Sequence, residues 1–472
     1  MKSKLPFILT SALLLGAAVL PLHAADKVTM TTGLAVGEQL RLAVNADAIV
    51  KLTWGNGDEQ TMESDGSLLT LEVKDASLTL TSEDLITSLY VQGNRLSALN
   101  VTAAPHLQSL FCADNSLEQL DLSKNTELEV LDAQGNALPT LSITNAKALD
   151  VVNVANNCLT KLTLAASARP TSVVCAGNQL TALPAATTLS CVNYLWTQDN
   201  AVKVLPIAQS KGLRGLNASD NQLTTINFAA TPQLHDVWVS GNELTTLDLS
   251  KSSPQLQSLV ADHNELTTVV WDKNSKRTMK YVALQHNAIC LNSMPSLVFG
   301  GANLYVDASE QKPYELPQKV YEVNETVNIN NLVAQNGWGV STFAQVSVLN
   351  EAGEPLTADT DYMVKNNAFT FKSVLKGLHF SITSSAYAGY TFTTSVFNVG
   401  TTEGIAHVEA NKPLTINAGK GCIQMTADCE TDVTVVNTAG ACVLRSHLVK
   451  GQHNLSIPAG VYVVNGHKVM VK

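Results

Sequence analysis

Aliphatic and polar positions repeat with a fixed period between residue 85 and about residue 297. Two copies illustrate the constant offsets, because Leu131 and Leu138 around one asparagine correspond to Val237 and Leu244 around another. The shared pattern is LxxLxLxxNxLxxLxL, and its asparagine recurs in steps of 21 to 23 residues at Asn94, Asn115, Asn136, Asn157, Asn178, Asn200, Asn221, Asn242, Asn264 and Asn287. A repeat this short cannot bury its own apolar face, so successive copies must stack into a solenoid.

The pattern resembles that of leucine-rich-repeat proteins, in particular bacterial surface proteins of the internalin and BspA-like types. The resemblance covers a little under half of the chain and implies a mostly β fold. We expect about ten 21-residue repeats over residues 85–297, flanked by β-sandwich modules. The part of each repeat after the asparagine is too short for a helix and itself alternates, as in Leu120-Asp121-Leu122, which predicts an extended or 3₁₀ outer wall.

The recurring asparagine has a structural explanation. Each coil turns sharply after its strand and leaves backbone N–H and C=O groups facing inward, and a single amide side chain can satisfy both kinds of group. The residue before it is usually Gly or Asp, as at Gly93, Asp114 and Gly135, which indicates a turn of unusual φ. We therefore predict a structural amide ladder rather than a catalytic one.

The segments outside the repeats also show strand periodicity. Residues 25–84 alternate around Leu40-Arg41-Leu42 and Leu69-Thr70-Leu71, and are predicted to form a β cap over one end of the solenoid. Trp54-Gly55-Asn56-Gly57-Asp58 resembles the tight turn of polycystic-kidney-disease-like modules, and it can equally be a hairpin with Trp54 in the core of the cap. Residues 313–399 combine short β-branched and aromatic strands with turn signals, which predicts an immunoglobulin-like β-sandwich.

Residues 404–472 are predicted to form a second β module. Its ending, from Val435-Val436-Asn437 through Gly460-Val461-Tyr462 to Lys472, resembles the C-terminal sorting domain of type IX secretion. The resemblance implies that this module is read by an outer-membrane secretion machinery. A plain terminal β module without that role is the alternative.

The amino terminus predicts export. Lys2 and Lys4 precede an apolar stretch from Leu13 to Leu20, and Ala24 supplies the small residue for cleavage, so residues 1–24 form the expected signal peptide. An uncleaved anchor is the weaker alternative. The mature chain would carry 28 basic and 40 acidic residues, a formal charge of −12, which makes nucleic acid an unlikely partner. No later apolar run is long enough to span a membrane, and we expect a secreted protein or one on the outer surface of a Gram-negative bacterium.

The eight cysteines do not suggest a disulfide framework. Cys112 and Cys175 occupy the inward strand position of the repeat and lie three repeats apart, roughly 14 Å, which is too far for a bridge. A single disulfide among Cys422, Cys429 and Cys442 is the pairing that sequence proximity allows.

The strand face of the solenoid is the candidate binding site. Outward positions of the repeat place Trp196 and Trp238 two repeats apart, roughly 10 Å, and large aromatic side chains there are not needed by the repeat core. The predicted ligand-binding residues are Tyr194, Trp196, Arg214, Asn217, Asp236, Trp238 and Tyr281. Alternatively, these aromatic residues pack on neighbouring aliphatic side chains or under a flanking domain and bind nothing.

Signals for chemistry are weak elsewhere. HExxH, GxSxG, GxxxxGK[ST] and GxGxxG motifs are absent from the sequence, so we expect no enzyme activity and no cofactor. Two imidazoles, His263 and His286, should lie about 5 Å apart at the turn edge, but a metal site would need a third ligand and solvated turn residues are the simpler interpretation.

The sequence therefore predicts a non-enzymatic surface protein that recognises an extracellular protein of a host or neighbouring cell. Paired aromatic residues with polar neighbours also suit sugar rings, which makes a surface glycan the alternative ligand. A purely structural role in surface assembly is the third possibility.

Overall fold

The computed structural model describes residues 24–46, 48–271, 279–294, 304–333, 344–387 and 389–400, and, nearer the C terminus, 414–418, 422–427, 430–437, 442–464 and 467–471. The predicted signal peptide lies outside these residues, apart from Ala24. Two compact units divide the chain. The first comprises Met1–Tyr314, Asn331–Val346 and Ser381–Thr393, and the second comprises Glu315–Asn330, Ser347–Phe380 and Thr394–Lys472.

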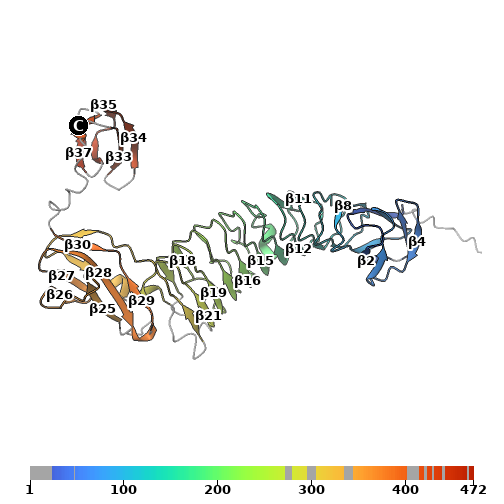
Figure 1. The fold of residues 1–472 in the computed structure, drawn as a ribbon, viewed down its shortest axis with the longest axis horizontal. Helices are drawn as coiled ribbons and strands as arrows, with labels where there is room; N and C mark the ends of the chain where they lie inside the picture. The colour runs from blue at the N-terminus through green and yellow to red at the C-terminus, as the bar shows by residue number, and fades with distance from the viewer. Residues whose placement is uncertain are drawn as a thin grey trace, which may run out of the picture. The chain divides into compact units, whose positions relative to one another are not determined.

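A 13-stranded sheet runs through the first unit and carries the repeats (Figure 1). Eleven of its strands are parallel and come from successive repeats, and we number them as rungs one to eleven. They are β7 (Ile86–Tyr90), β9 (Ser109–Phe111), β10 (Val130–Asp132), β12 (Val151–Asn153), β14 (Ser172–Val174), β15 (Tyr194–Trp196), β16 (Gly215–Asn217), β17 (Asp236–Trp238), β19 (Ser258–Val260), β21 (Tyr281–Ala283) and β22 (Tyr305–Asp307). The predicted leucine-rich-repeat solenoid is thus confirmed, and its sheet continues past residue 297 to rung eleven.

The central residue of each short strand points into the core. Leu131, Leu195 and Val237 are examples, and each is 0% exposed. Burial of one such aliphatic side chain stabilises the fold by roughly 1.5–3 kcal/mol. Because the buried side chains of each rung pack against those of the next, the apolar core is continuous along the solenoid.

The asparagines form the predicted amide ladder. Asn157 is representative: its Nδ2 donates to the Ala133 carbonyl of the preceding rung at 3.0 Å and to Val154 O in its own turn at 3.2 Å. Its Oδ1 accepts the backbone N–H of Leu138 at 3.1 Å. Each of the ten ladder asparagines donates in the same way to a carbonyl of the preceding rung or, for Asn94, of the cap.

The residue before each asparagine lies in the left-handed region of φ. Glycine occupies this position at Gly93, Gly135, Gly177 and Gly241, where φ lies between +60° and +70°. Other residues adopt it as well, namely Asp114, Asn156, Asp199, Asp220, His263 and His286, with φ between +51° and +55°. The same tight turn therefore recurs even where the sequence offers no glycine or Asp, and tertiary packing imposes it.

Both ends of the ladder are closed by other residues. At the N-terminal end, Asn94 donates to Arg41 O at 2.6 Å and its Oδ1 accepts Arg41 N–H at 2.8 Å. At the C-terminal end, Gln311 takes the asparagine's place, donating to Leu284 O at 2.7 Å and accepting Ile289 N–H at 3.0 Å. The ladder thus ends one rung later than the asparagine count indicates.

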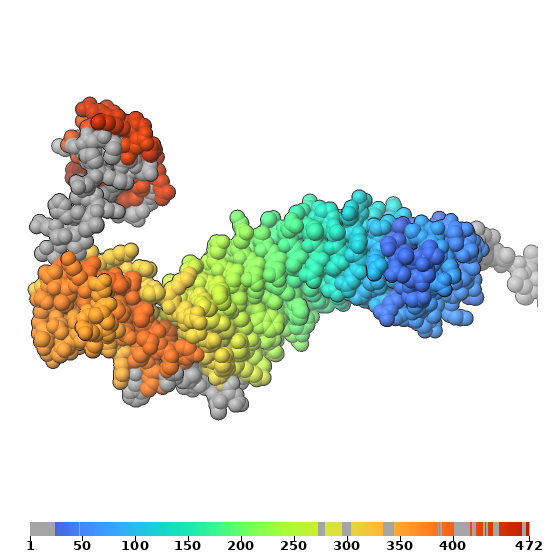
Figure 2. Space-filling view, viewed as in Figure 1, coloured from blue at the N-terminus to red at the C-terminus, as the bar shows by residue number. Residues whose placement is uncertain are grey.

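The N-terminal cap is fused to the first rung. Its strands β2 (Gln39–Ala46) and β5 (Leu69–Glu72) extend the 13-stranded sheet, and β2 pairs antiparallel with β7. A second, five-stranded sheet has the order β4 (Glu59–Met62), β3 (Val50–Trp54), β6 (Ser77–Ser82), β1 (Asp26–Thr32) and β8 (Leu96–Ala103). Figure 2 shows the cap in blue continuing without a gap into the first rungs.

Trp54 belongs to the core of the cap. Its side chain is 2% exposed, and its backbone N–H donates a hydrogen bond to the Asp58 carbonyl across the β3–β4 turn at 2.9 Å. Of the two interpretations of the Trp54–Asp58 segment, the structure supports the hairpin.

The outer wall contains short extended and 3₁₀ segments, as predicted. The strands pair in parallel as β11 (Thr140–Ile143) with β13 (Lys161–Leu164), and β18 (Thr246–Asp248) with β20 (Thr268–Val270). Among the described residues the wall also contains the 3₁₀ turns η1 (Thr188–Cys191) and η2 (Leu291–Ser293).

Two further sheets follow the solenoid in the chain. The five-stranded sheet comprises β23 (Val320–Tyr321), β30 (Phe397–Val399), β28 (Leu375–Ser384), β25 (Ala344–Leu349) and β29 (Thr391–Thr393), and the three-stranded sheet comprises β24 (Thr326–Asn328), β27 (Ala368–Phe371) and β26 (Tyr362–Lys365). Short helical turns are α1 (Asn330–Val333) and η4 (Ser385–Tyr387). Phe371 of one sheet and Phe397 of the other are fully buried with ring centroids 5.7 Å apart, so the two sheets face each other across an aromatic core.

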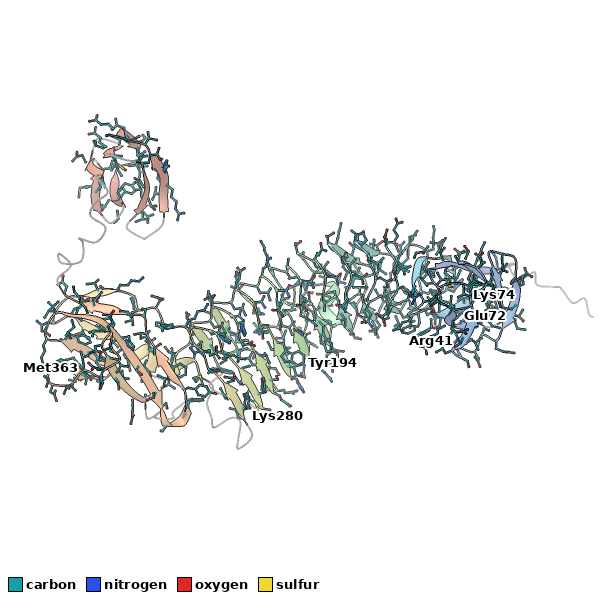
Figure 3. All side chains as sticks on the ribbon, in the orientation of Figure 1. Arg41, Glu72, Lys74, Tyr194, Lys280 and Met363 are labelled. Carbon is teal, nitrogen blue, oxygen red and sulfur yellow. The ribbon has the colours of Figure 1, made fainter. Side chains whose placement is uncertain are left out.

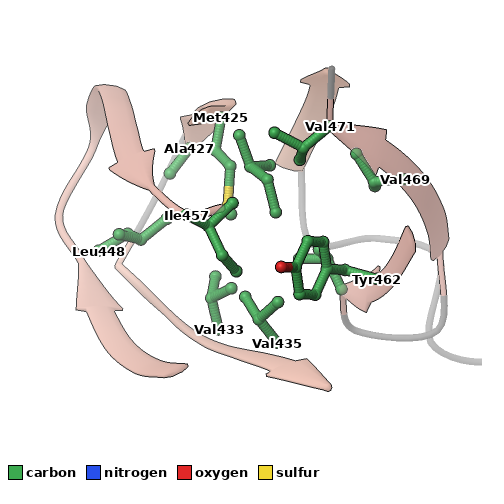
Figure 4. Packing of buried hydrophobic residues seen from close by; sticks show 11 residues of the cluster. Met425, Ala427, Val433, Val435, Leu448, Ile457, Tyr462, Val469 and Val471 are labelled. Carbon is green, nitrogen blue, oxygen red and sulfur yellow. The ribbon is translucent and has the colours of Figure 1, made fainter. Parts of the chain in front are cut away.

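The C-terminal module consists of two small sheets. One contains β31 (Leu414–Ala418), β32 (Cys422–Ala427) and β35 (Gly451–Ser456), and the other contains β34 (Cys442–Leu448), β33 (Thr431–Asn437), β36 (Gly460–Val464) and β37 (His467–Val471). Met425 from the first sheet and Val435 and Tyr462 from the second enclose one apolar core (Figure 4).

The buried cysteines are core residues. Cys112 and Cys175 are free thiols with 0% exposure, as predicted. Cys422 is also a free thiol, and Cys429 and the side chain of Cys442 lie outside the described part of the chain. None of the described helices has the length and apolar character needed to cross a membrane.

Replacing one ladder asparagine should destabilise the solenoid. Asn157→Ala leaves the buried Leu138 N–H without its acceptor and removes one of the two amide donors to Ala133 C=O, which we expect to cost roughly 1–3 kcal/mol. Asn145→Ala is the matched control, because Asn145 is exposed and makes one bond, to Ser123 O. Urea unfolding followed by circular dichroism measures both, and equal midpoints for the two variants would refute a structural role of the ladder.

Native thiol labelling should distinguish buried from exposed cysteines. Burial raises the pKa of Cys112 and Cys290 to about 12 and that of Cys175 to about 11, so these thiols stay protonated and covered at pH 8. Iodoacetamide should modify the exposed Cys158 and Cys191 within minutes and leave the three buried thiols unmodified until denaturant is added. Peptide mapping by mass spectrometry checks this, and modification of Cys112 under native conditions would contradict the packing.

The same thiols should make stability depend on alkaline pH. The Cys112 thiol has a pKa of 9.0 in the unfolded chain, and burial raises this pKa to about 12 in the folded protein. Between pH 9 and pH 12 the folded state therefore binds more protons than the unfolded state. The free energy of unfolding should therefore fall as pH rises above 9, and less steeply in Cys112→Ala. Equal slopes in the two proteins would exclude this contribution.

Candidate functional site

The outward side chains of the rungs form two columns, which together we call the strand face. Parallel pairing in register aligns them, so that the first column contains Ser88, Ser109, Val130, Val151, Ser172, Tyr194, Gly215, Asp236, Ser258, Tyr281 and Tyr305. The second contains Tyr90, Phe111, Asp132, Asn153, Val174, Trp196, Asn217, Trp238, Val260, Ala283 and Asp307. Columns of this kind hold side chains at the strand spacing on a rigid backbone.

Rung six carries two exposed aromatic side chains. Tyr194 is 46% exposed and Trp196 is 40% exposed, although strand β15 between them buries Leu195 completely. Figure 3 labels Tyr194 and Lys280 on the same long side of the solenoid. Two large exposed rings on one three-residue strand are more than core packing requires.

Gly215 on the next rung makes room for these rings. A Cβ atom placed on Gly215 would lie 2.9 Å from Tyr194 Cδ1 and 4.0 Å from Trp196 Nε1. Both rings of rung six therefore lean toward rung seven and cover its backbone. Gly215 has no positive φ, so the requirement for glycine here is one of space.

Asn217 and Trp238 extend the cluster over rungs seven and eight. The register pairs Asn217 with Trp196 on one side and Trp238 on the other, so the two indoles are two rungs apart, roughly 9.6 Å. Asn217 Oδ1 accepts the N–H of Ser219 at 3.1 Å, which fixes the side chain at the start of the turn and leaves its Nδ2 as the donor for a ligand.

Arg214 and Asp236 place opposite charges beside the rings. The backbone N–H of Asp236 donates to Arg214 O at 3.1 Å, which ties the two strand starts together. Arg214 is exposed and Asp236 is partly buried. Among the residues that the structure describes, neither side chain forms an ion pair, so both charges are available to a partner.

Tyr281 lies apart from this cluster. It is two rungs beyond Asp236 in the first column and stacks on Tyr305 of rung eleven, with ring centroids 5.2 Å apart and an interplanar angle of 11°. Tyr305 is 54% exposed and was not among the predicted residues, because it follows the last ladder asparagine. The sequence does contain a signal for Tyr305. Gln311 follows Tyr305 by six residues, just as Asn287 follows Tyr281 by six residues.

The aromatic residues at the other end of the columns are less accessible. Tyr90 and Phe111 are partly buried, and their ring centroids are 6.3 Å apart. These two rings therefore pack on each other rather than standing clear of the surface.

The two histidine rings, His263 and His286, contact each other at the turn edge in a tilted arrangement. Their ring centroids are 4.2 Å apart, His263 Nδ1 lies 2.6 Å from Asp262 Oδ2, and His286 Nε2 lies 3.3 Å from Glu310 Oε2. The described residues contain no group of three His, Cys, Asp or Glu side chains arranged to hold a metal ion. Burial raises the pKa of nearby Asp220, and Asp199 and Asp262 raise it further, so this edge is acidic.

No protein-family model and no curated relative matches the chain. Solved structures similar to it include the functional domain of InlJ from Listeria monocytogenes, with 18% identity over 66% of this chain and 81% of that one and a TM-score of 0.40. YopM, a leucine-rich effector protein from Yersinia pestis, is 24% identical over 53% of this chain and 71% of its own, with a TM-score of 0.39. An internalin, InlF, from Listeria monocytogenes is 16% identical over 48% and 81%, with a TM-score of 0.31.

The assignment of the chain as a leucine-rich-repeat β-solenoid accordingly rests on its own strand register and amide ladder.

Adding a side chain at Gly215 should move Tyr194 without unfolding the solenoid. In Gly215→Ala the new methyl meets the Cδ1 edge of the Tyr194 ring rather than backbone, and because this ring is 46% exposed it can turn away, so we expect a stability change within about 1 kcal/mol and a rotated Tyr194. Melting temperature and a crystal structure of the variant measure the two effects. An unmoved ring, or a loss of several kcal/mol, would contradict the contact described above.

Proposed function

We propose that this chain is an exported surface protein that recognises an extracellular protein, of a host or a neighbouring cell, through the strand face at rungs six to eight. The observation that carries the proposal is the exposure of Tyr194 and Trp196 on either side of Leu195, which is fully buried. Aromatic anchors held on a rigid backbone lose little conformational entropy when a partner binds. Trp238, Asn217, Arg214 and Asp236 would complete the contact surface, and Tyr281 would add a separate contact.

The proposed organisation follows the sequence. Residues 1–24 would direct export, residues 25–84 cap the solenoid, and residues 313–399 form an immunoglobulin-like spacer. Residues 404–472, by their resemblance to type IX sorting domains, would engage an outer-membrane secretion machinery and place the protein outside a Gram-negative cell. The proposal includes no catalytic step and no cofactor.

A surface glycan is the second candidate ligand. The observation in its favour is the polar rim, because Asn217, Asp236 and Arg214 adjoin two exposed rings on which a sugar could stack. Free monosaccharides should compete with a glycan, whereas added salt should weaken a protein contact that uses Arg214 and Asp236.

The test is a binding screen of the mature protein against extracellular-matrix protein and glycan arrays, alongside the double variant Trp196→Ala/Trp238→Ala. We expect at least one protein ligand whose binding falls by about tenfold or more in the double variant, since removing an interface anchor typically costs 1–2 kcal/mol or more. Surface plasmon resonance on the hit gives the fold-change.

Tyr90→Ala/Phe111→Ala is the matched control, because it removes two aromatic rings from the same column at the opposite end of the sheet. Its binding should equal that of the unmodified protein. Equal loss in both double variants would assign the effect to general destabilisation, and identical profiles for all three proteins would refute the strand-face site.

A further inference from the structure

Between rungs six and ten, aromatic rings occupy alternate rungs; those of rungs six and ten are exposed and that of Trp238 is partly buried. Rung six carries Tyr194 and Trp196, rung eight carries Trp238, and rung ten carries Tyr281. Rungs seven and nine have no aromatic residue in either column, where Gly215 with Asn217 and Ser258 with Val260 stand instead. The strand face thus presents aromatic ridges separated by two strand spacings, roughly 9.6 Å.

One extended polypeptide conformation has nearly this period. A polyproline II helix has three residues per turn and rises about 3.1 Å per residue, so its side chains recur about every 9.3 Å. Two periods along the ridges differ from two turns of such a helix by less than about 1 Å. A β-strand fits less well, because its side chains on one face recur at about 6.8 Å.

Polar groups beside the ridges also suit this conformation. A polyproline II chain has no internal hydrogen bonds, so its carbonyls are free acceptors. The Trp196 Nε1–H lies beside the space over Gly215 and donates no hydrogen bond within the described part of the chain, and Asn217 Nδ2 lies on the neighbouring rung. Both can donate to carbonyls of a chain that lies across the rungs.

Asp236 adds charge complementarity. Its carboxylate is in rung eight with Trp238, and within the described part of the chain it has no ion pair. A basic side chain of the ligand would form an ion pair with the Asp236 carboxylate, between the rings of rung six and those of rung ten. The formal charge of −10 on the whole protein favours approach of such a ligand.

We propose that the strand face binds a proline-rich segment in the polyproline II conformation, with a Lys or Arg directed at Asp236. This inference rests on the proposed function and specifies the class of its protein partner. The ligand lies across the strands, its apolar side chains contact the rings of rungs six, eight and ten, and Tyr305 on rung eleven extends the contact.

The length of the aromatic surface limits the useful length of the ligand. Rung six to rung eleven spans five strand spacings, about 24 Å, which a polyproline II chain covers with about eight residues. Affinity should therefore rise with peptide length up to about nine residues and then stay level.

Calorimetric titration of the mature protein with synthetic peptides tests this. The probes are oligoprolines of three, six, nine and twelve residues, each with and without one central Arg, and a Gly-Ser peptide of nine residues with the same charge. We expect no binding of the Gly-Ser peptide, a plateau at nine prolines, and a loss of about tenfold or more in Trp238→Ala. Asp236→Asn should reduce binding of the Arg-containing peptide about threefold and leave the all-proline peptide unchanged.

Tyr90→Ala/Phe111→Ala again serves as the control and should bind all peptides like the unmodified protein. Equal affinity for the Gly-Ser and proline peptides, or no plateau with length, would overturn the inference. If oligoproline fails while an array protein still binds in a Trp196- and Trp238-dependent way, the inference is wrong and the proposed function stands. If a glycan shows that dependence instead, both the inference and the protein-recognition proposal are wrong.

Discussion

The fold depends on one hydrogen-bonding requirement, which recurs at every turn of the solenoid. A left-handed residue and a change of direction follow each short strand, so a backbone carbonyl and a backbone N–H of the same rung face the interior without a strand partner. The ladder amide bonds both, as Asn157 does for Ala133 O and Leu138 N–H. An unpaired buried group would cost roughly 1–3 kcal/mol, so the stack is possible only because this side chain is present at every rung.

The strand face follows from the same requirement. The ladder and the aliphatic core keep all eleven strands in parallel register, so side chains two residues apart form straight columns. Tyr194 and Trp196 need no packing partners of their own because the backbone beneath them is already fixed. Because these rings contribute little to the core, they are available to bind a partner. This is the physical basis of the proposed function.

The repeat architecture could be predicted from sequence because its determinants are local and periodic. The spacing of Asn94 to Asn287, the aliphatic offsets and the outward columns were all readable, and hydrogen bonds and register confirm them. Features that depend on contacts between distant segments were missed. Strand β8 pairs with β1 of the cap, and Gln311 continues the ladder with a longer side chain that the asparagine pattern does not include.

The candidate site was predicted in composition but not in detail. Register alone placed Trp196, Asn217 and Trp238 on adjacent rungs. The lean of Tyr194 over Gly215 and the stacking of Tyr281 on Tyr305 depend on side-chain packing, which periodicity does not specify. The predicted domain boundaries and ligand-binding roles stay predictions, since they concern partners and processing rather than the fold.

Amide hydrogen exchange measures the central claim most directly. The N–H groups of Leu117, Leu138 and Leu159 lie outside the strands and are bonded by asparagine Oδ1 atoms at 2.9–3.1 Å. If the ladder holds the solenoid together, these amides should exchange as slowly as the strand amides of neighbouring rungs, while the Ser123 amide, whose one bond is to the exposed Asp121 side chain in the repeat of Leu117, exchanges much faster. Exchange of Leu138 at the rate of Ser123 would contradict the account.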